Sequence, residues 1–172
     1  MDQHLLILGG ARSGKSRYAE ENLEKTTLPV TYIATAQAFD DEMRARIAQH
    51  RKQRSANWET VEAPLDLPKT VRQVSPERAI LVDCLTLWLS NLILAERDVD
   101  SASADLLEAL GTRTPPVVLV SNEVGMGVVP DTPLGRVFRD AQGRLNQTVA
   151  AQVGRVVFVA AGLPLVLKGA GG

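Results

Sequence analysis

The chain has 172 residues, 45% of them hydrophobic and 23% charged, which is typical of a globular domain with one sizeable core. A formal net charge of −1 excludes a broadly basic surface built for nucleic acid, although a local anion site remains possible. The single cysteine, Cys84, excludes an intramolecular disulfide and favours the cytoplasm. Because Cys84 follows an apolar run, we expect it to be a buried structural thiol.

No membrane anchor is predicted. The first ten residues lack a basic segment ahead of a long apolar run, so they do not resemble a signal peptide. The longest apolar region, residues 79–95, is interrupted by polar side chains, beginning with Asp83. It therefore predicts a buried strand followed by an amphipathic helix, and not a membrane span.

Short apolar runs alternate with helical patterns along the chain. Strands are predicted at 4–9, 29–35, 58–63, 78–83, 116–122 and 155–162. Helices are predicted at 16–25, 40–54, 66–74 and 132–153, with a short helix between polar loops within 97–114. Apolar strands separated by helices indicate an α/β fold with a mainly parallel sheet and helices on both faces. Without a repeat or a linker, residues 1–172 form a single domain.

The long helix predicted at 132–153 has candidate capping residues at its start and two internal glycines. Asp131 or Thr132 can cap its first turn, where Pro133 fits well. Gly135 and Gly143 weaken a helix interior, so we expect each to allow close packing against a neighbour.

A phosphate-binding loop is predicted between the first strand and the first helix. Residues 9–16, GGARSGKS, fit the spacing G-x-x-x-x-G-K-[ST]. The glycines allow consecutive N–H groups to surround a phosphate, and the following helix adds its positive N-terminal end. Lys15 can reach the β- and γ-phosphates, and the Ser16 hydroxyl can ligate Mg²⁺. The fold class is therefore of the P-loop NTPase type.

A metal-side carboxylate is predicted at Asp83, which ends the apolar strand AILVD. An acid at the end of a strand beside a phosphate loop is suited to holding Mg²⁺ or its water. The loop and the acid together predict an enzyme or a switch that uses a nucleoside triphosphate. They do not name the acceptor, because kinases, GTPases and motors share these parts.

The predicted helix at 40–54, DDEMRARIAQHRKQR, contains His50. Acids in its first turn and cations in its later turns suit the helix dipole, so a solvated surface helix accounts for these residues. Alternatively, the neighbouring cations keep His50 neutral and attract a triphosphate. A neutral imidazole in those surroundings can form a covalent phosphoramidate. The residues alone leave both interpretations open. His4, without such neighbours, is expected to be structural.

Four segments together resemble the family of bifunctional adenosylcobinamide kinases/adenosylcobinamide-phosphate guanylyltransferases, and the likeness covers nearly the whole chain. They are GGARSGKSRYAE, YIATAQAFDDEMRARIAQHR, a tryptophan followed by VEAP, and VSNEVGMGVVPDTPLGRVFRDAQGRLNQTVA. The NEVGMG segment and the helix DDEM to His50 are more specific than the phosphate loop, which many families share.

The resemblance implies an enzyme of coenzyme B12 assembly with two activities. The first phosphorylates the aminopropanol hydroxyl of adenosylcobinamide, using ATP or GTP. The second transfers GMP from GTP to adenosylcobinamide phosphate, releasing pyrophosphate and giving adenosylcobinamide-GDP. The guanylyl group rests on a histidine in the helix after the second strand, which is His50 here. The family also implies a homotrimer with its nucleotide site near a subunit boundary.

The same resemblance assigns the site residues. It gives the catalytic role to His50, whereas the catalytic role of Lys15 and metal ligation by Ser16 and Asp83 come from the phosphate-loop and strand-end patterns described above. The residues expected to bind nucleotide are Gly9, Gly10, Ala11, Arg12, Ser13, Gly14, Lys15, Ser16, Ala34, Thr35, Ala36, Arg51, Lys52, Gln53, Arg54, Glu62 and Asp83.

Three points stay open at this level. A P-loop small-molecule kinase without guanylyl transfer shares the phosphate loop and the acid. A GTP-dependent switch module shares them too, although the chain lacks an N-K-x-D guanine motif. Asn122 and Glu123 follow a predicted strand, and they either orient the acceptor or a water, or form a capped turn.

Overall fold

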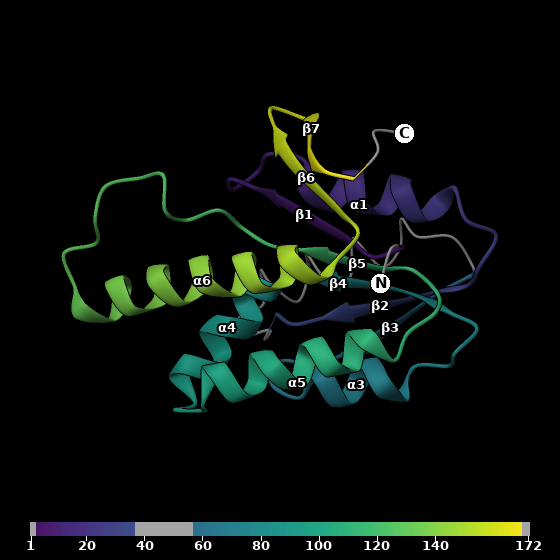
Figure 1. Cartoon of the computed structure of the whole chain (residues 1–172), viewed down its shortest axis with the longest axis horizontal. Coiled ribbons are helices and arrows are strands. Elements are labelled where there is room, and N and C mark those ends of the chain that lie inside the picture. Colours follow the sequence, from purple (N-terminus) through teal and green to yellow (C-terminus); the bar gives the residue numbers. More distant parts are fainter. Residues whose placement is uncertain (1–2, 37–56, 170–172) are drawn as a thin grey trace, which may run out of the picture.

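The computed structural model describes residues 3–36 and 57–169, so the expected helix at 40–54 lies outside the described residues. Within these ranges the chain forms one α/β layered structure (Figure 1). The strands are β1 (Leu5–Gly9), β2 (Val30–Ala34), β3 (Trp58–Glu62), β4 (Ala79–Asp83), β5 (Val117–Val120), β6 (Arg155–Ala160) and β7 (Leu163–Lys168). The helices are α1 (Lys15–Glu24), α3 (Leu67–Gln73), α4 (Leu85–Leu94), α5 (Val99–Gly111) and α6 (Pro133–Gln152).

The strands form one seven-stranded sheet in the order β3-β2-β4-β5-β1-β6-β7. The first six strands of this order are parallel, and β7 pairs antiparallel with β6 at the edge. Because parallel strands end at the same edge of a sheet, the ends of β1, β2, β3, β4 and β5 meet along one line. The phosphate loop and Asp83 both lie along this line, at the carboxyl ends of the parallel strands.

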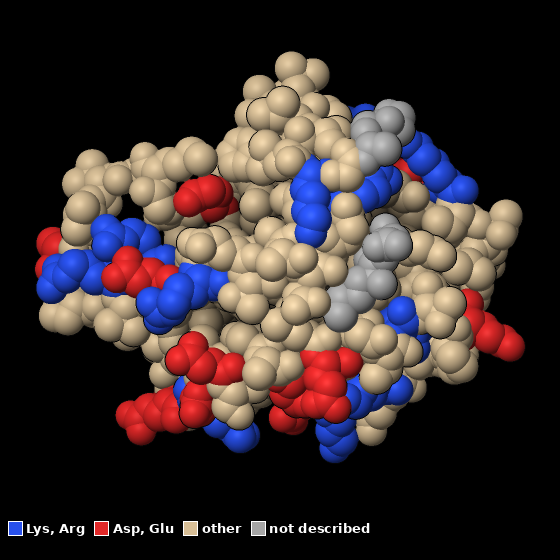
Figure 2. All heavy atoms as spheres, in the orientation of Figure 1, with Lys and Arg blue, Asp and Glu red and all other residues tan. Residues whose placement is uncertain are grey.

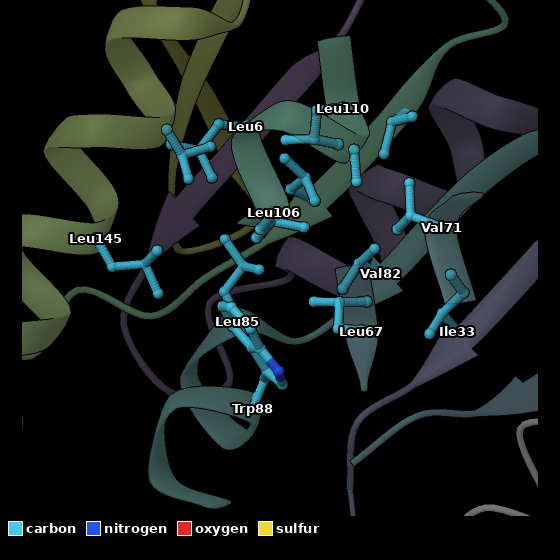
Figure 3. Packing of buried hydrophobic residues seen from close by; sticks show 14 of the residues in the cluster. Leu6, Ile33, Leu67, Val71, Val82, Leu85, Trp88, Leu106, Leu110 and Leu145 are labelled. Atoms are coloured by element: carbon cyan, nitrogen blue, oxygen red, sulfur yellow. The ribbon is translucent and has the colours of Figure 1, made fainter. Parts of the chain in front are cut away.

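The central strands β1, β4 and β5 are buried on both faces of the sheet, as their continuous apolar sequences predict, whereas the outer strands β3 and β7 are largely exposed. Alternate residues of β4 separate into two clusters: Ile80 and Val82 pack with α3, α4, α5 and α6, and Leu81 packs with α1. Figure 3 shows the larger cluster, in which Trp88 of α4 and Leu106 of α5 are fully buried. The expected helices on both faces are therefore confirmed.

Two elements differ from the sequence prediction. The strand expected at 155–162 ends at Ala160, and the chain turns back through Ala161 and Gly162 into β7, which the prediction omitted. Both turn residues have positive φ, 51° and 80°, but alanine at the first of them is not a recognised hairpin signal. The expected short helix within 97–114 is the 13-residue α5, and the Asp98 side chain caps it by accepting a hydrogen bond from Ser101 N at 2.9 Å.

The long helix α6 begins as predicted. Thr132 is its N-cap, and its hydroxyl oxygen accepts a hydrogen bond from Gly135 N at 3.1 Å, with Pro133 in the first turn. Close packing is confirmed at Gly135, where a Cβ atom would lie 2.8 Å from the ring of Pro130. It is wrong at Gly143, where a Cβ atom would meet nothing within 4 Å. No helix within residues 3–36 and 57–169 is long and apolar enough to cross a membrane.

His4 is a structural side chain that links the start of β1 to the start of β5 and to the end of α5. Its Nδ1 accepts a hydrogen bond from Val117 N at 3.2 Å, so Nε2 carries the proton and donates to the Leu110 carbonyl oxygen at 3.1 Å. The ring is 1% exposed. Burial lowers the pKa of His4 below its ordinary value of 6.5, and the positive charge of Arg113 adds to the effect.

This burial predicts a pH dependence of stability. The pKa of His4 is lower in the folded than in the unfolded state, so its contribution is present above pH 6.5 and is lost as the pH falls below it. Urea unfolding of the wild type and of His4→Gln, which has no titrating ring, measures this difference. The free energy of unfolding of the wild type should fall more steeply below pH 6.5. Parallel pH profiles for the two proteins would contradict the assignment.

Candidate active site

The phosphate loop joins β1 to α1 and requires glycine at both ends. Gly9 has φ 151°, and a Cβ atom there would lie 2.3 Å from the carbonyl oxygen of Val159 on β6. Gly14, the N-cap of α1, has φ 99°. Side chains rarely adopt these conformations, so glycine is needed for the loop to leave the strand and enter the helix. Arg12 also has a positive φ, 54°, which adds backbone strain within the loop.

The β6–β7 hairpin supports this loop from the side. Gly162 N, in the hairpin turn, donates a hydrogen bond to the Ser13 carbonyl oxygen at 2.8 Å. A Cβ atom on Gly14 would lie 3.2 Å from the Gly162 Cα atom, which leaves little room between the two segments. The loop geometry therefore depends on a turn about 150 residues further along the chain, which local sequence patterns do not indicate.

Lys15 is the buried cation of the site. Its side chain is 7% exposed, and Nζ donates a hydrogen bond to the Gly10 carbonyl oxygen at 2.5 Å. Burial lowers the pKa of Lys15, and the negative charge of the nearby Asp83 carboxylate opposes that change. The ammonium group thus contacts the loop backbone and lies near the acid at the end of β4.

A cavity of about 270 Å³ opens over the loop and the first turn of α1. It is lined by Arg12, Ser13, Gly14, Lys15, Ser16 and Arg17. Among the described residues, the buried hydroxyl oxygen of Ser13 has no hydrogen-bond partner. A polar cavity with two arginines, a lysine and the N-terminus of a helix suits the phosphates of a nucleotide.

Asp83 lies where the sequence predicts, at the end of β4. In the sheet register it is level with Ala34 of β2 and Val120 of β5. The Tyr32 hydroxyl donates a hydrogen bond to Asp83 Oδ2 at 3.2 Å. Glu62 ends β3 level with Ala34 and is exposed, so the two predicted acids lie on the same edge of the sheet.

The segment after β2 is tied to the segment after β4. The Thr35 hydroxyl accepts a hydrogen bond from Cys84 N and donates one to the Cys84 carbonyl oxygen, both at 2.7 Å. Asn91 of α4 donates to the Thr35 carbonyl oxygen at 2.9 Å. The Thr35 side chain is fully buried in these contacts, and Ala36 is half-buried beside it. This connection fixes the end of β2 relative to Asp83.

Cys84 is the buried thiol that the sequence predicts, 6% exposed. Burial and the neighbouring Asp83 carboxylate raise its pKa to about 11. The thiol is therefore protonated at neutral pH and fills space in the core beneath the site.

The two residues of interest after β5, Asn122 and Glu123, make different hydrogen bonds. The Glu123 carboxylate accepts a hydrogen bond from Gly125 N, with its two oxygens at 2.8 and 2.9 Å, which is a capped turn. The Asn122 backbone is hydrogen-bonded on both sides, by the Thr86 hydroxyl and the Asn146 side chain. The sequence alone left open whether Asn122 and Glu123 form a capped turn or orient the acceptor or a water. For Glu123 the structure shows the capped turn, because its carboxylate accepts the hydrogen bond from Gly125 N.

The remaining predicted residues lie outside the part of the chain that the structure describes. They are His50, Arg51, Lys52, Gln53 and Arg54.

The fold and the loop define a P-loop nucleotide-binding protein of the α/β class. Comparison with solved structures agrees on the fold. The RadB recombinase superposes with a TM-score of 0.51 at 14% identity, over 91% of this chain and 74% of that one. A Pyrococcus horikoshii OT3 protein superposes with a TM-score of 0.58 at 8% identity, over 99% and 88%.

Sequence comparison then identifies the family. The model of the cobinamide kinase/cobinamide phosphate guanyltransferase family matches residues 5–167, and the chain belongs to this family. The bifunctional adenosylcobalamin biosynthesis protein CobP of Pseudomonas aeruginosa is 52% identical, over 95% of this chain and 96% of its own length. The CobU proteins of Salmonella typhimurium and Escherichia coli K12 are each 41% identical, over 95% of this chain and 99% of theirs.

Proposed function

We propose that this chain carries out both reactions of its family in cobalamin biosynthesis. It phosphorylates adenosylcobinamide with ATP or GTP, and it then transfers GMP from GTP to the resulting phosphate. The proposal depends chiefly on one observation, the glycine-dependent phosphate loop with buried Lys15 beside Asp83, in a chain that matches the family over residues 5–167. Cytoplasmic localisation accords with the lone, reduced Cys84.

In the kinase step, the loop N–H groups and Lys15 bind the β- and γ-phosphates. The acceptor hydroxyl oxygen forms a bond to the γ-phosphorus in line with the leaving group, and the bond to the β,γ-bridging oxygen breaks. The electron pair leaves on the nucleoside diphosphate, and the hydroxyl proton passes to water. Lys15 moves from the Gly10 carbonyl oxygen to the phosphates, where its charge offsets the charge that develops in transfer.

In the guanylyl step, His50 is the proposed nucleophile. An imidazole nitrogen forms a bond to the α-phosphorus of GTP, and the bond to the α,β-bridging oxygen breaks to release pyrophosphate. An oxygen of adenosylcobinamide phosphate then attacks the same phosphorus, and the P–N bond breaks to restore the imidazole. The cations Arg51, Lys52 and Arg54 beside His50 favour its neutral form and attract the triphosphate.

Magnesium is the proposed metal, and the described residues suit it. Mg²⁺ bound to a nucleotide needs only one or two protein oxygen ligands, because phosphates and waters supply the others. Ser16 follows Lys15 in the first turn of α1, and Asp83 is close enough to influence the pKa of that lysine. Bound there, the ion would supply charge neutralisation for the phosphates. Within residues 3–36 and 57–169, no group of three or more His, Cys, Asp or Glu side chains is placed so that it could hold a metal ion by itself.

The other nucleotide contacts are proposed from position along the same edge. Ala34, Thr35 and Ala36 end β2 beside Asp83, and Glu62 ends β3 next to them. The side chain of Thr35 is engaged with Cys84, so we assign its contact to the backbone. Small residues at this place let a base or ribose approach the strand ends closely.

A homotrimer is also proposed, and strand β7 supports an oligomer. All six of its residues are exposed, including Leu163, Leu165, Val166 and Leu167, so both faces of this edge strand are apolar. Figure 2 shows an uncharged surface at the turn end of the β6–β7 hairpin, whose two charged residues, Arg155 and Lys168, lie at its other end. An exposed apolar edge strand favours association unless another chain covers it.

Product analysis tests the function and separates its alternatives. With adenosylcobinamide and GTP, we expect adenosylcobinamide phosphate first and adenosylcobinamide-GDP with pyrophosphate afterwards. A small-molecule kinase without guanylyl transfer would stop at the phosphate. A GTP-dependent switch would yield only GDP and free phosphate. Either of these two results would contradict the proposal.

A further inference from the structure

Asn122 lies between the two halves of the phosphate site. Strand β5 separates β1, which leads into the phosphate loop, from β4, which ends at Asp83. Beyond β5 the chain keeps following β1: Ser121 N donates to the Ile7 carbonyl oxygen at 2.9 Å, and Glu123 N donates to the Gly9 carbonyl oxygen at 3.0 Å. Asn122 therefore has an extended backbone conformation and lies level with Gly9, the first residue of the phosphate loop.

The alternation of strand side chains directs Asn122 to the loop side of the sheet. Val118 and Val120 pack in the cluster that contains α1, whereas Leu119 packs in the cluster on the other face. The Ser121 hydroxyl contacts α6, which covers that other face. Because neighbouring side chains of an extended chain point to opposite faces, Asn122 points to the face of α1 and Lys15.

The carboxamide of Asn122 has no hydrogen-bond partner among the residues that the structure describes, and the side chain is half-buried. Its backbone, in contrast, is fixed: Asn122 N donates to the Thr86 hydroxyl at 2.7 Å, and its carbonyl oxygen accepts from Asn146 Nδ2 at 3.1 Å. A fixed backbone that carries a free amide, beside a phosphate loop, is suited to binding a ligand.

The anchor behind Asn122 is a buried polar network. Gln142 Nε2 donates to the Ser121 hydroxyl at 2.9 Å and to Asn146 Oδ1 at 3.0 Å, and the Ser121 hydroxyl donates to Asn146 Oδ1 at 2.6 Å. Gln142 is fully buried in α6. Gln142 Oε1 has no hydrogen-bond partner among the described residues, so three hydrogen bonds of this network, and not a fully paired set, fix Ser121 and Asn146 relative to each other. Here the network holds the chain that presents Asn122.

We propose that Asn122 is a catalytic residue of the kinase step. Its side-chain N–H donates a hydrogen bond to an oxygen of the γ-phosphoryl group as that group moves from the nucleotide to the acceptor hydroxyl. The amide stabilises charge and takes no proton, so the bonds made and broken are those of the kinase step already described. Thr86 and Asn146 are positioning residues that act through the Asn122 backbone. The inference depends on the kinase activity proposed above.

The test compares three substitutions in the full chain with wild-type protein. For Asn122→Ala, kcat of adenosylcobinamide phosphorylation should fall about 10²-fold, with little change in KM for the nucleotide. Asn122→Asp keeps the shape but places a negative charge against the phosphate, so its kcat should fall at least as far. Asn57→Ala makes the same change at an exposed position by the opposite edge of the sheet and should leave kcat unchanged.

A second measurement separates catalysis from folding. Thermal unfolding of Asn122→Asp should match that of wild type, and labelling of the protein by GTP in the absence of acceptor should persist, because that reaction occurs at the α-phosphorus. Wild-type kcat in Asn122→Asp would overturn the inference, as would equal losses of kinase activity, labelling and thermal stability. Absence of phosphorylated product from wild-type protein would instead contradict the proposed function itself.

The positioning role has its own readout. Thr86→Val removes the oxygen that accepts from Asn122 N and should lower kinase kcat, whereas Thr86→Ser should retain it. Added to Asn122→Ala, the Thr86→Val change should have no further effect, because both act through one amide. Additive losses in the double variant would show that Thr86 acts independently of Asn122, contrary to the proposal.

Discussion

Replacing Lys15 with alanine should lower kcat/KM of the kinase step by about 10³-fold. The ammonium group is already buried against the loop and needs only to exchange the Gly10 carbonyl oxygen for phosphate oxygens. Its loss removes a cation from the place where negative charge develops in phosphoryl transfer. Steady-state kinetics with adenosylcobinamide and either ATP or GTP measure the change. Guanylyl transfer should fall as well, because both steps use the same bound triphosphate.

The expected effect on stability distinguishes this role from a structural one. The cation is buried and rests on one carbonyl oxygen, so the ligand-free Lys15→Ala protein should unfold at nearly the wild-type temperature. Nucleotide should stabilise the wild type and have little effect on the variant. Lys69→Ala, at an exposed position on α3, is the matched control and should behave as wild type. Equal nucleotide stabilisation of Lys15→Ala and wild type would contradict the assignment.

Replacing His50 with alanine should abolish guanylyl transfer and retain the kinase. The two steps differ in the phosphorus that reacts: the γ-phosphorus is transferred to the acceptor directly, whereas the α-phosphorus passes through an imidazole. Adenosylcobinamide and GTP should therefore give adenosylcobinamide phosphate alone, without pyrophosphate. Separation of the corrinoid products measures the outcome, and the retained kinase shows that the variant is folded. Formation of adenosylcobinamide-GDP by this variant would rule out His50 as the nucleophile.

The features that the sequence predicts well are encoded by neighbouring residues. The phosphate loop has its strand, its glycines, its lysine and its helix within residues 5–24, so a short pattern specifies all of them. Asp83 likewise follows directly from the apolar strand before it. The mainly parallel sheet follows from the repetition of such strands between helices.

The features that the sequence does not predict depend on contacts between segments that lie far apart along the chain. The hairpin turn at Gly162 holds the loop at Ser13, and only the sheet order places β6 beside β1. The Thr35 hydroxyl is bonded to the backbone of Cys84 because β2 pairs with β4. The direction of Asn122 follows from a strand conformation that continues past the apolar run. A sequence pattern identifies these residues but does not show which of them contact one another.

The central claim is that His50 carries the guanylyl group, and isolation of that intermediate tests it most directly. Wild-type protein would be incubated with GTP labelled at the α-phosphorus, without a corrinoid, and the labelled peptide identified by mass spectrometry. We expect one acid-labile, base-stable guanylyl group on His50, and no protein label from GTP labelled at the γ-phosphorus. Label on another residue, or an unlabelled protein that still makes adenosylcobinamide-GDP, would contradict it.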